Sequence, residues 1–172
     1  MLTNGKITLR PISVKDTDFI LSLRNDTDIS QEFISDPPMY DFTHEQWIKN
    51  RTGDFLDFII VVEGDDAGRI YVYPISYRHQ HAEMGIVLMK DFRKKDIAYK
   101  AGILLIDYIF TNLPIRKIFL HVFSDNADAI RLYNRLGFRT EGIFKEEYYK
   151  NGTWRDITRM ALFTTGWKKG QK

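Results

Sequence analysis

SDNADAIRLYNRLGF (residues 124–138) carries the clearest structural signals in this chain. Asn126 is a residue type that caps the N-termini of helices, and Gly137 suits the left-handed conformation that often follows a helix. Between them, apolar side chains recur at helical spacing at Ile130, Tyr133 and Leu136. These signals predict a short amphipathic helix with Tyr133 on its apolar face.

The segments before this helix alternate between strand and helix. Residues 117–123 (KIFLHVF) and residues 84–90 (MGIVLMK) have the composition of buried strands. Residues 97–113 lie between them, and their apolar side chains recur at helical spacing. A strand, a helix and a strand in this order predict a βαβ crossover at the centre of a mixed sheet.

Hairpin signals follow the helix and also occur in the first half of the chain. Residues 139–149 and 153–164 flank Asn-Gly at positions 151–152, a dipeptide typical of a two-residue hairpin turn. Two strand-like runs between residues 56 and 77 are joined around residues 64–66, which also suit a tight turn. The unpaired edge of the last hairpin makes a homodimer an expected assembly.

The N-terminal part is predicted to contain one strand and two helices. Residues 6–12 (KITLRPI) alternate apolar and polar side chains, as a half-buried strand does. Residues 13–24 follow with helical periodicity. A capping-box pattern formed by Thr43 and Gln46 predicts that a second helix begins there.

Composition and charge restrict the class of protein. The chain has 172 residues, 44% of them hydrophobic and 28% charged, which is ordinary for one globular domain spanning residues 1–172. It has no cysteine, which excludes disulfides and thiolate metal sites. The absence of a signal-peptide pattern or of a run of about 20 apolar residues predicts a cytoplasmic protein without membrane contact. A formal net charge of +2 does not suggest nucleic acid as a partner.

The four histidines do not form a metal site in the sequence. His79 and His81 have no third ligand at metal spacing, so we expect no metal. They lie just before Glu83 and are expected to influence substrate access. His44 and His121 are interpreted as an ordinary helix residue and an ordinary strand residue.

A family resemblance adds to this interpretation. The pattern N-x-x-A-I-x-L-Y-x-x-x-G-F in residues 126–138 is very similar to motif B of the GNAT superfamily of acetyl-coenzyme A-dependent N-acetyltransferases. The opening TLRPISVKDTDFILSLRND and the closing pattern E-G-x-x-x-E-x-x-x-x-x-G-x-x-x-D-x-x-x-M resemble the branch of ribosomal-protein N-terminal acetyltransferases and spermidine acetyltransferases. The resemblance implies an α/β fold with a mixed, mostly antiparallel sheet of about seven strands. It also implies acetyl-CoA as cofactor, held by the strand-helix-strand-helix core.

Residues 91–98 (DFRKKDIA) lead into the predicted long helix. Family members carry the motif Q/R-x-x-G-x-G/A here, whose backbone N–H groups hold the cofactor pyrophosphate. The resemblance assigns cofactor binding to Arg93, Lys94, Lys95, Asp96, Ile97 and Ala98. Asp96 stands where the family usually has glycine and places a carboxylate beside the diphosphate, although aspartate tolerates a left-handed conformation and is able to cap a helix. A solvated basic loop is the alternative interpretation.

Acetyl transfer to an amine requires a base for the amine proton, a donor to the thioester oxygen and an acid for the thiolate. By the resemblance, Tyr133 is the acid and Glu83 the base. A core aromatic and an exposed strand-end carboxylate are the respective alternatives. The resemblance implies that two parallel strands splay to admit the pantetheine arm, with the oxygen polarised by a backbone N–H near Val87 or Leu88. Asn126 contacts the cofactor or an ordered water, serves as the helix N-cap, or does both.

The acceptor implied by the resemblance is a primary amine. It is either a small polyamine-like compound or amino sugar, or a protein N-terminus such as that of a ribosomal protein. Residues suited to a cationic acceptor are Asp36, Asp41, Glu45, Glu146, Glu147, Trp47, Tyr148, Tyr149 and Trp154. Solvated surface carboxylates and packed aromatics are the alternative for this set. An acyl-CoA-binding module without activity is the alternative function.

Overall fold

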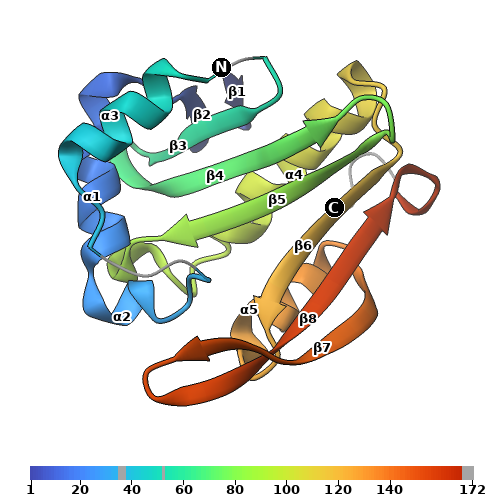
Figure 1. The fold of residues 1–172 in the computed structure, drawn as a ribbon. Helices are drawn as coiled ribbons and strands as arrows, with labels where there is room; N and C mark the ends of the chain where they lie inside the picture. The colour runs from blue at the N-terminus through green and yellow to red at the C-terminus, as the bar shows by residue number, and fades with distance from the viewer. Residues whose placement is uncertain (35–37, 52, 168–172) are drawn as a thin grey trace.

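One sheet runs through the whole molecule, with helices on both of its faces (Figure 1). The structure is a computed structural model that describes residues 1–34, 38–51 and 53–167. Within these ranges the sheet has eight strands in the order β1-β2-β3-β4-β5-β6-β8-β7. The strands are β1 (Leu2–Thr3), β2 (Ile7–Pro11), β3 (Leu56–Val62), β4 (Asp65–Ser76), β5 (His81–Leu88), β6 (Lys117–Phe123), β7 (Arg139–Lys150) and β8 (Thr153–Phe163). The helices are α1 (Thr17–Asn25), α2 (Thr27–Ser30), α3 (Asp41–Lys49), α4 (Ile97–Asn112) and α5 (Ala127–Arg135).

Of the strand pairs in the described ranges, only β5 and β6 run parallel, and α4 connects them as the sequence predicts. Their ladder begins where His81 pairs with Lys117 and ends where Glu83 pairs with Phe119. Beyond this point the two strands diverge (Figure 1). β5 nevertheless stays paired with β4 as far as Leu88. The divergence opens the sheet in its middle.

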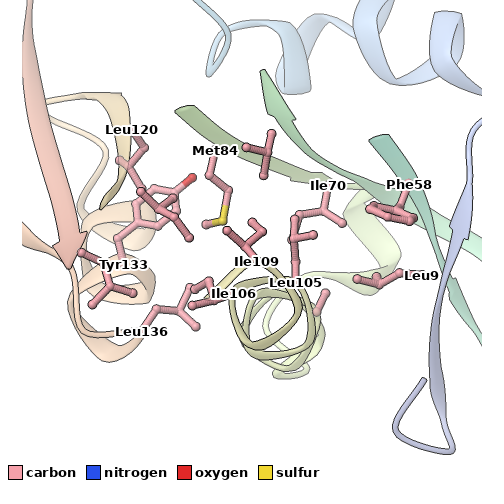
Figure 2. Packing of buried hydrophobic residues seen from close by; sticks show 14 of the residues in the cluster. Leu9, Phe58, Ile70, Met84, Leu105, Ile106, Ile109, Leu120, Tyr133 and Leu136 are labelled. Carbon is pink, nitrogen blue, oxygen red and sulfur yellow. The ribbon is translucent and has the colours of Figure 1, made fainter. Parts of the chain in front are cut away.

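Two hydrophobic cores lie on opposite faces of the sheet because successive side chains of a strand point to opposite faces. Ile60 belongs to the larger core under α4, and its neighbour Ile59 belongs to the smaller core under α1. Figure 2 shows the larger core, in which α4 packs against the sheet and lies beside Tyr133 and Leu136. A Cβ on Gly102 of α4 would lie 2.9 Å from a methyl group of Leu136, so the glycine permits this close contact.

The structure confirms the helix predicted from residues 124–138. Asn126 is its N-cap, and the side-chain oxygen of Asn126 accepts a hydrogen bond of 3.0 Å from the backbone N–H of Ala129. Gly137 follows the helix with a φ of +96°, a conformation that strongly favours glycine. Tyr133 is buried on the apolar face.

Both predicted hairpins are present, and the glycines in their turns have the positive φ angles that such turns require. Asn151 and Gly152 have φ angles of +51° and +80° between β7 and β8. In the first hairpin, Glu63 and Gly64 form the turn with φ angles of +52° and +103°. This turn lies earlier than the predicted residues 64–66 because β4 already begins at Asp65.

The capping box predicted at Thr43 and Gln46 is wrong. α3 begins at Asp41, with Tyr40 at the N-cap position. The reason is tertiary: Nδ1 of His44 lies 3.1 Å from the hydroxyl of Thr17 on α1, and His44 is buried there. That contact determines which face of α3 turns inward and outweighs the local capping signal.

The sheet has eight strands in the described ranges, one more than the approximate number expected. The additional strand is β1, which pairs Leu2 with Leu9 and Thr3 with Thr8. A two-residue strand has no periodicity in the sequence, so it depends on pairing with β2. β5 also begins earlier than predicted, at His81, because its first residues pair with both β4 and β6.

Candidate active site

A cleft of about 1590 Å³ lies where β5 and β6 diverge. Its walls come from β5, β6, the start of α4, one side of α5 and the region of α1 and α2. Glu83, Val87, Leu88, Asn126 and Tyr133 all line it. The structure therefore brings together residues that the sequence analysis selected from β5 and from α5 with its N-cap.

Glu83 faces His121 across the last part of the β5–β6 ladder. Oε1 of Glu83 lies 2.9 Å from Nδ1 of His121, and both side chains keep partial access to the cleft. The interpretation of His121 as an ordinary strand residue is therefore incomplete. The signal that could have found it is register, because a parallel pairing of the two strands brings His121 close to Glu83.

Tyr133 reaches the cleft from the opposite side of the sheet. Its ring packs against Phe138 with 5.8 Å between the ring centroids. Figure 2 shows its hydroxyl pointing from α5 toward Met84 on β5. Burial, with a smaller contribution from Tyr71, raises the pKa of Tyr133, so the phenol stays neutral at physiological pH. It is thus both a core aromatic and a cleft residue.

The backbone of β5 presents one edge to the cleft. The N–H of Met89 donates a hydrogen bond of 2.9 Å to the carbonyl of Ala67 on β4. Because N–H directions alternate along a strand, the N–H of Val87 also points toward β4, and that of Leu88 points away from it. Arg93 contacts the same outward edge, donating a hydrogen bond of 3.2 Å from Nε to the carbonyl of Leu88. Of the two predicted amides, that of Leu88 is the one directed at the cleft.

The loop before α4 has the features of an anion cradle. No backbone N–H in residues 94–99 donates a hydrogen bond to any part of the chain that the structure describes. Lys94 and Asp96 both have a φ of +59°, which turns successive amides in one direction. Arg93, Lys94, Ile97 and Ala98 line the cleft, whereas the ammonium of Lys95 lies 5.9 Å from the ring centroid of Phe92. These free amides fit the pyrophosphate of acetyl-CoA.

Asp96 adopts the left-handed conformation that glycine has in the family motif. Its carboxylate makes no cap to α4 and instead forms an ion pair with Arg135 on α5. The hydrogen bond and charge of Arg135 lower the pKa of Asp96, so the pair is ionised at neutral pH. The carboxylate is thus partly neutralised by a residue distant in sequence.

Replacing Asp96 by glycine is expected to tighten acetyl-CoA binding by about three- to tenfold. The change removes a negative charge beside the phosphate cradle and keeps the positive φ at no steric cost. Titration calorimetry measures the effect, and Asp91→Asn, which removes an exposed charge outside the cleft, is the matched control. Weaker binding by Asp96→Gly would contradict this expectation and would show that the ion pair with Arg135 holds the loop in place.

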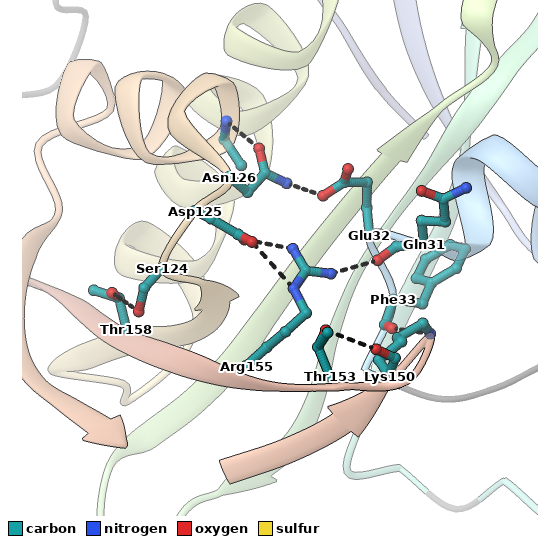
Figure 3. A network of polar contacts seen from close by, with 11 residues as sticks. Gln31, Glu32, Phe33, Ser124, Asp125, Asn126, Lys150, Thr153, Arg155 and Thr158 are labelled. Atoms are coloured by element: carbon teal, nitrogen blue, oxygen red, sulfur yellow. Dashed lines mark hydrogen bonds and ion pairs between the residues drawn. The ribbon is translucent and has the colours of Figure 1, made fainter. Parts of the chain in front are cut away.

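Asn126 belongs to a polar network that closes the cleft near α2 (Figure 3). Its amide nitrogen donates to Glu32, while its oxygen caps α5. Arg155 on β8 forms an ion pair with Asp125 and donates a hydrogen bond of 3.1 Å to the carbonyl of Gln31. Both ends of the Asn126 side chain are therefore engaged within the protein, which supports its capping role.

Most carboxylates considered for the acceptor lie away from the cleft. Glu45 forms an ion pair of 3.1 Å with Lys49, and Asp36 lies outside the described residues. Asp41, Glu146 and Glu147 are exposed and do not line the cleft. Among the aromatics, Tyr148 lines the cleft, whereas the exposed rings of Tyr149 and Trp154 contact each other in a tilted arrangement across the hairpin with 5.3 Å between centroids.

His79 and His81 also lie away from the cleft. Their rings stack with 5.9 Å between centroids, and His81 packs on Phe119 at the start of β5. In the described ranges, no three His, Cys, Asp or Glu side chains are arranged to hold a metal ion. No described helix is long and apolar enough to cross a membrane.

Comparison with known proteins places this site in context. The model of the acetyltransferase (GNAT) domain matches residues 6–139. Spermidine N(1)-acetyltransferase of Vibrio cholerae is 32% identical over 163 residues, which cover 92% of this chain and 94% of the relative. The Escherichia coli K12 enzyme of the same name is 29% identical and covers 91% of this chain and 86% of its own length. A crystal structure of the Vibrio cholerae enzyme with CoA and spermine superposes with a TM-score of 0.90 at 28% identity, covering 95% of this chain and 98% of that one.

Proposed function

This chain belongs to the GNAT family of acetyltransferases, and from that premise we propose that Glu83, His121 and Tyr133 carry its chemistry. The activity is acetyl-CoA-dependent N-acetylation of an amine. When bound, acetyl-CoA supplies the thioester whose acetyl group is transferred. The strongest support for these roles is their placement. Tyr133 approaches the opening between β5 and β6 from the α4 face, and Glu83 and His121 approach it from the other face.

In this proposal Glu83 accepts the proton of the incoming amine, directly or through a water. His121 acts as a positioning residue, since its Nδ1 contacts the Glu83 carboxylate at 2.9 Å. The N–H of Leu88 is directed at the cleft and donates to the carbonyl oxygen under attack. Tyr133, whose pKa is raised by burial, keeps its proton and offers it to the departing sulfur.

We further propose that the cofactor phosphates lie on the amides of residues 94–99, with Arg93 and Lys94 beside them. The unsatisfied N–H groups and the N-terminus of α4 support this placement, because both favour anions. The ion pair between Asp96 and Arg135 weakens the case for an inactive acyl-CoA-binding module. That alternative was motivated by the presence of a carboxylate in the phosphate-binding loop.

The acceptor is proposed to be a small primary amine that enters from the side of α1 and α2. The names of the relatives make polyamines such as spermidine the first candidates to assay.

One Vibrio cholerae relative is described as dodecameric, and β7 is an exposed sheet edge in this chain, so we propose self-association as well. A cytoplasmic location stays a prediction from the sequence.

The direct test is thiol release from acetyl-CoA in the presence and absence of an amine. We expect acetyl-CoA to raise the melting temperature and thiol release to depend on the added acceptor. A panel of spermidine, amino sugars and short peptides with free N-termini separates the candidate acceptor classes. Stabilisation by acetyl-CoA without thiol release from any acceptor would instead favour the inactive module.

Replacing Glu83 by glutamine is expected to lower kcat/KM for the amine by about a hundredfold, because the amide cannot accept the proton. His121→Asn should have a smaller effect and should add little to Glu83→Gln, since His121 acts through Glu83. Steady-state kinetics of the single and double variants measure this coupling. Glu63→Gln, at an exposed turn, is the matched control. Fully additive losses would show that His121 acts independently.

A further inference from the structure

A second, smaller cavity of about 150 Å³ lies beside the cleft. It is bounded by α1, α3 and β4, and Arg24, Tyr71 and Tyr73 line both it and the cleft. This cavity, the arginine pocket, is also lined by Arg51, Arg69 and His44. It has room for roughly five water molecules at about 30 Å³ each, and so for a small ionic group.

The charge of the arginine pocket is strongly one-sided. It has three guanidinium groups, and no described residue that lines it is acidic. Asp57 lies behind Arg69 and holds it in a buried ion pair, with Nε and Oδ1 2.8 Å apart. Asp57 and Asp54 both act on the charge of Arg51, but neither carboxylate lines the pocket. Burial, and then the charge of Arg69, lower the pKa of His44.

Arg51 presents hydrogen-bond donors without acceptors. Its guanidinium carbon lies 3.7 Å from the ring centroid of Trp47 and 3.9 Å from that of Tyr73. Nε and Nη1 of Arg51 are buried and have no hydrogen-bond partner among the described residues. Stacking explains the orientation of Arg51 but satisfies none of these donors, and unsatisfied buried donors are costly. An acceptor group supplied by a ligand would satisfy them.

Tyr71 connects the arginine pocket to the reacting groups. A Cβ on Gly85 would lie 2.3 Å from the ring of Tyr71, so the ring lies directly against the backbone of β5. Gly85 is two residues from Glu83 on the same strand, and their side-chain positions share one face of the sheet. Tyr71 therefore lies between the arginine pocket and the part of β5 that carries Glu83.

We propose that the arginine pocket binds an oxyanion of the amine acceptor, a carboxylate or a phosphate, while Glu83 receives the amine. This inference rests on the proposed acetyltransfer at Glu83. Planar guanidinium forks suit carboxylate and phosphate oxygens, and a polyamine would place an ammonium group against three cations. The acceptor class is therefore an amine that carries an anion.

Matched acceptor pairs test this directly. Lysine and cadaverine differ by one carboxylate, and glucosamine 6-phosphate and glucosamine differ by one phosphate. In the wild-type protein, kcat/KM for at least one anionic acceptor should exceed that of its partner by about tenfold or more. The pair with the larger ratio identifies the oxyanion.

Variants of Arg51 test which side chain is responsible. Arg51→Gln should bring that ratio close to one, and Arg51→Lys should keep only part of it because lysine lacks the planar fork. Arg78→Gln removes a charge at an exposed turn and should leave the ratio unchanged.

Glutarate, which has carboxylates but no amine, gives a readout that does not require turnover of an anionic acceptor. It should compete with the amine in the wild-type protein, and its inhibition constant should rise about tenfold in Arg51→Gln. A preference for cadaverine and glucosamine over their anionic partners would overturn this inference alone, as would ratios that Arg51→Gln leaves unchanged. Absence of thiol release with every acceptor would overturn the proposed acetyltransfer as well.

Discussion

Replacing Tyr133 by phenylalanine is expected to lower kcat by about a hundredfold or more while acetyl-CoA still binds with nearly unchanged affinity. The substitution removes only the hydroxyl that we assign as proton donor to the departing sulfur. The ring that packs against Phe138 remains, so the fold should be retained. Steady-state kinetics and a thermal shift with acetyl-CoA measure the two parts of this expectation.

Tyr149→Phe is the matched control for Tyr133→Phe, because it removes the same hydroxyl from an exposed ring outside the cleft. Its kcat should equal that of the wild-type protein. Unchanged turnover in Tyr133→Phe would remove Tyr133 from the mechanism and leave it as a core aromatic. A loss of both turnover and stabilisation by acetyl-CoA would indicate that the hydroxyl serves binding instead.

Replacing Asp57 by alanine is expected to lower the free energy of unfolding by about 3–5 kcal/mol, since removal of one partner leaves a buried charge uncompensated. Asp57 and Arg69 are almost fully buried, with their side chains 1% and 8% exposed. Burial alone would lower the pKa of Arg69, but the hydrogen bonds and charge of Asp57 outweigh it and raise that pKa. The melting temperature should fall by about 10 °C or more.

Two variants test the cause of the Asp57 effect. Asp57→Asn keeps the shape but removes the charge, so it should be destabilising as well. Asp57→Leu combined with Arg69→Met removes both charges and should recover much of the stability. Chemical denaturation gives the free energies. A loss below about 1 kcal/mol in Asp57→Ala would show that water or a rearranged side chain compensates Arg69.

Local sequence signals predicted the elements whose ends depend on their own neighbouring residues. The Asn126 cap and Gly137 delimit α5, and the Asn-Gly pair at residues 151–152 turns the last hairpin. The signal at Thr43 failed because packing of His44 against Thr17 outweighs it. Capping and turn chemistry act over a few residues, so one sequence suffices to detect them unless a buried contact opposes them.

The sequence by itself determined the helix that carries Tyr133, the loop from Arg93 to Ala98 and the glutamate on β5. Only the tertiary structure decided which partners these groups have. His121 contacts Glu83, Arg135 pairs with Asp96, and the arginine pocket gathers cations from α1, β4 and the segment that follows α3. The physical reason is distance along the chain. Such contacts form when sheet register and helix packing bring remote segments together, whereas caps, turns and motifs are complete within one segment.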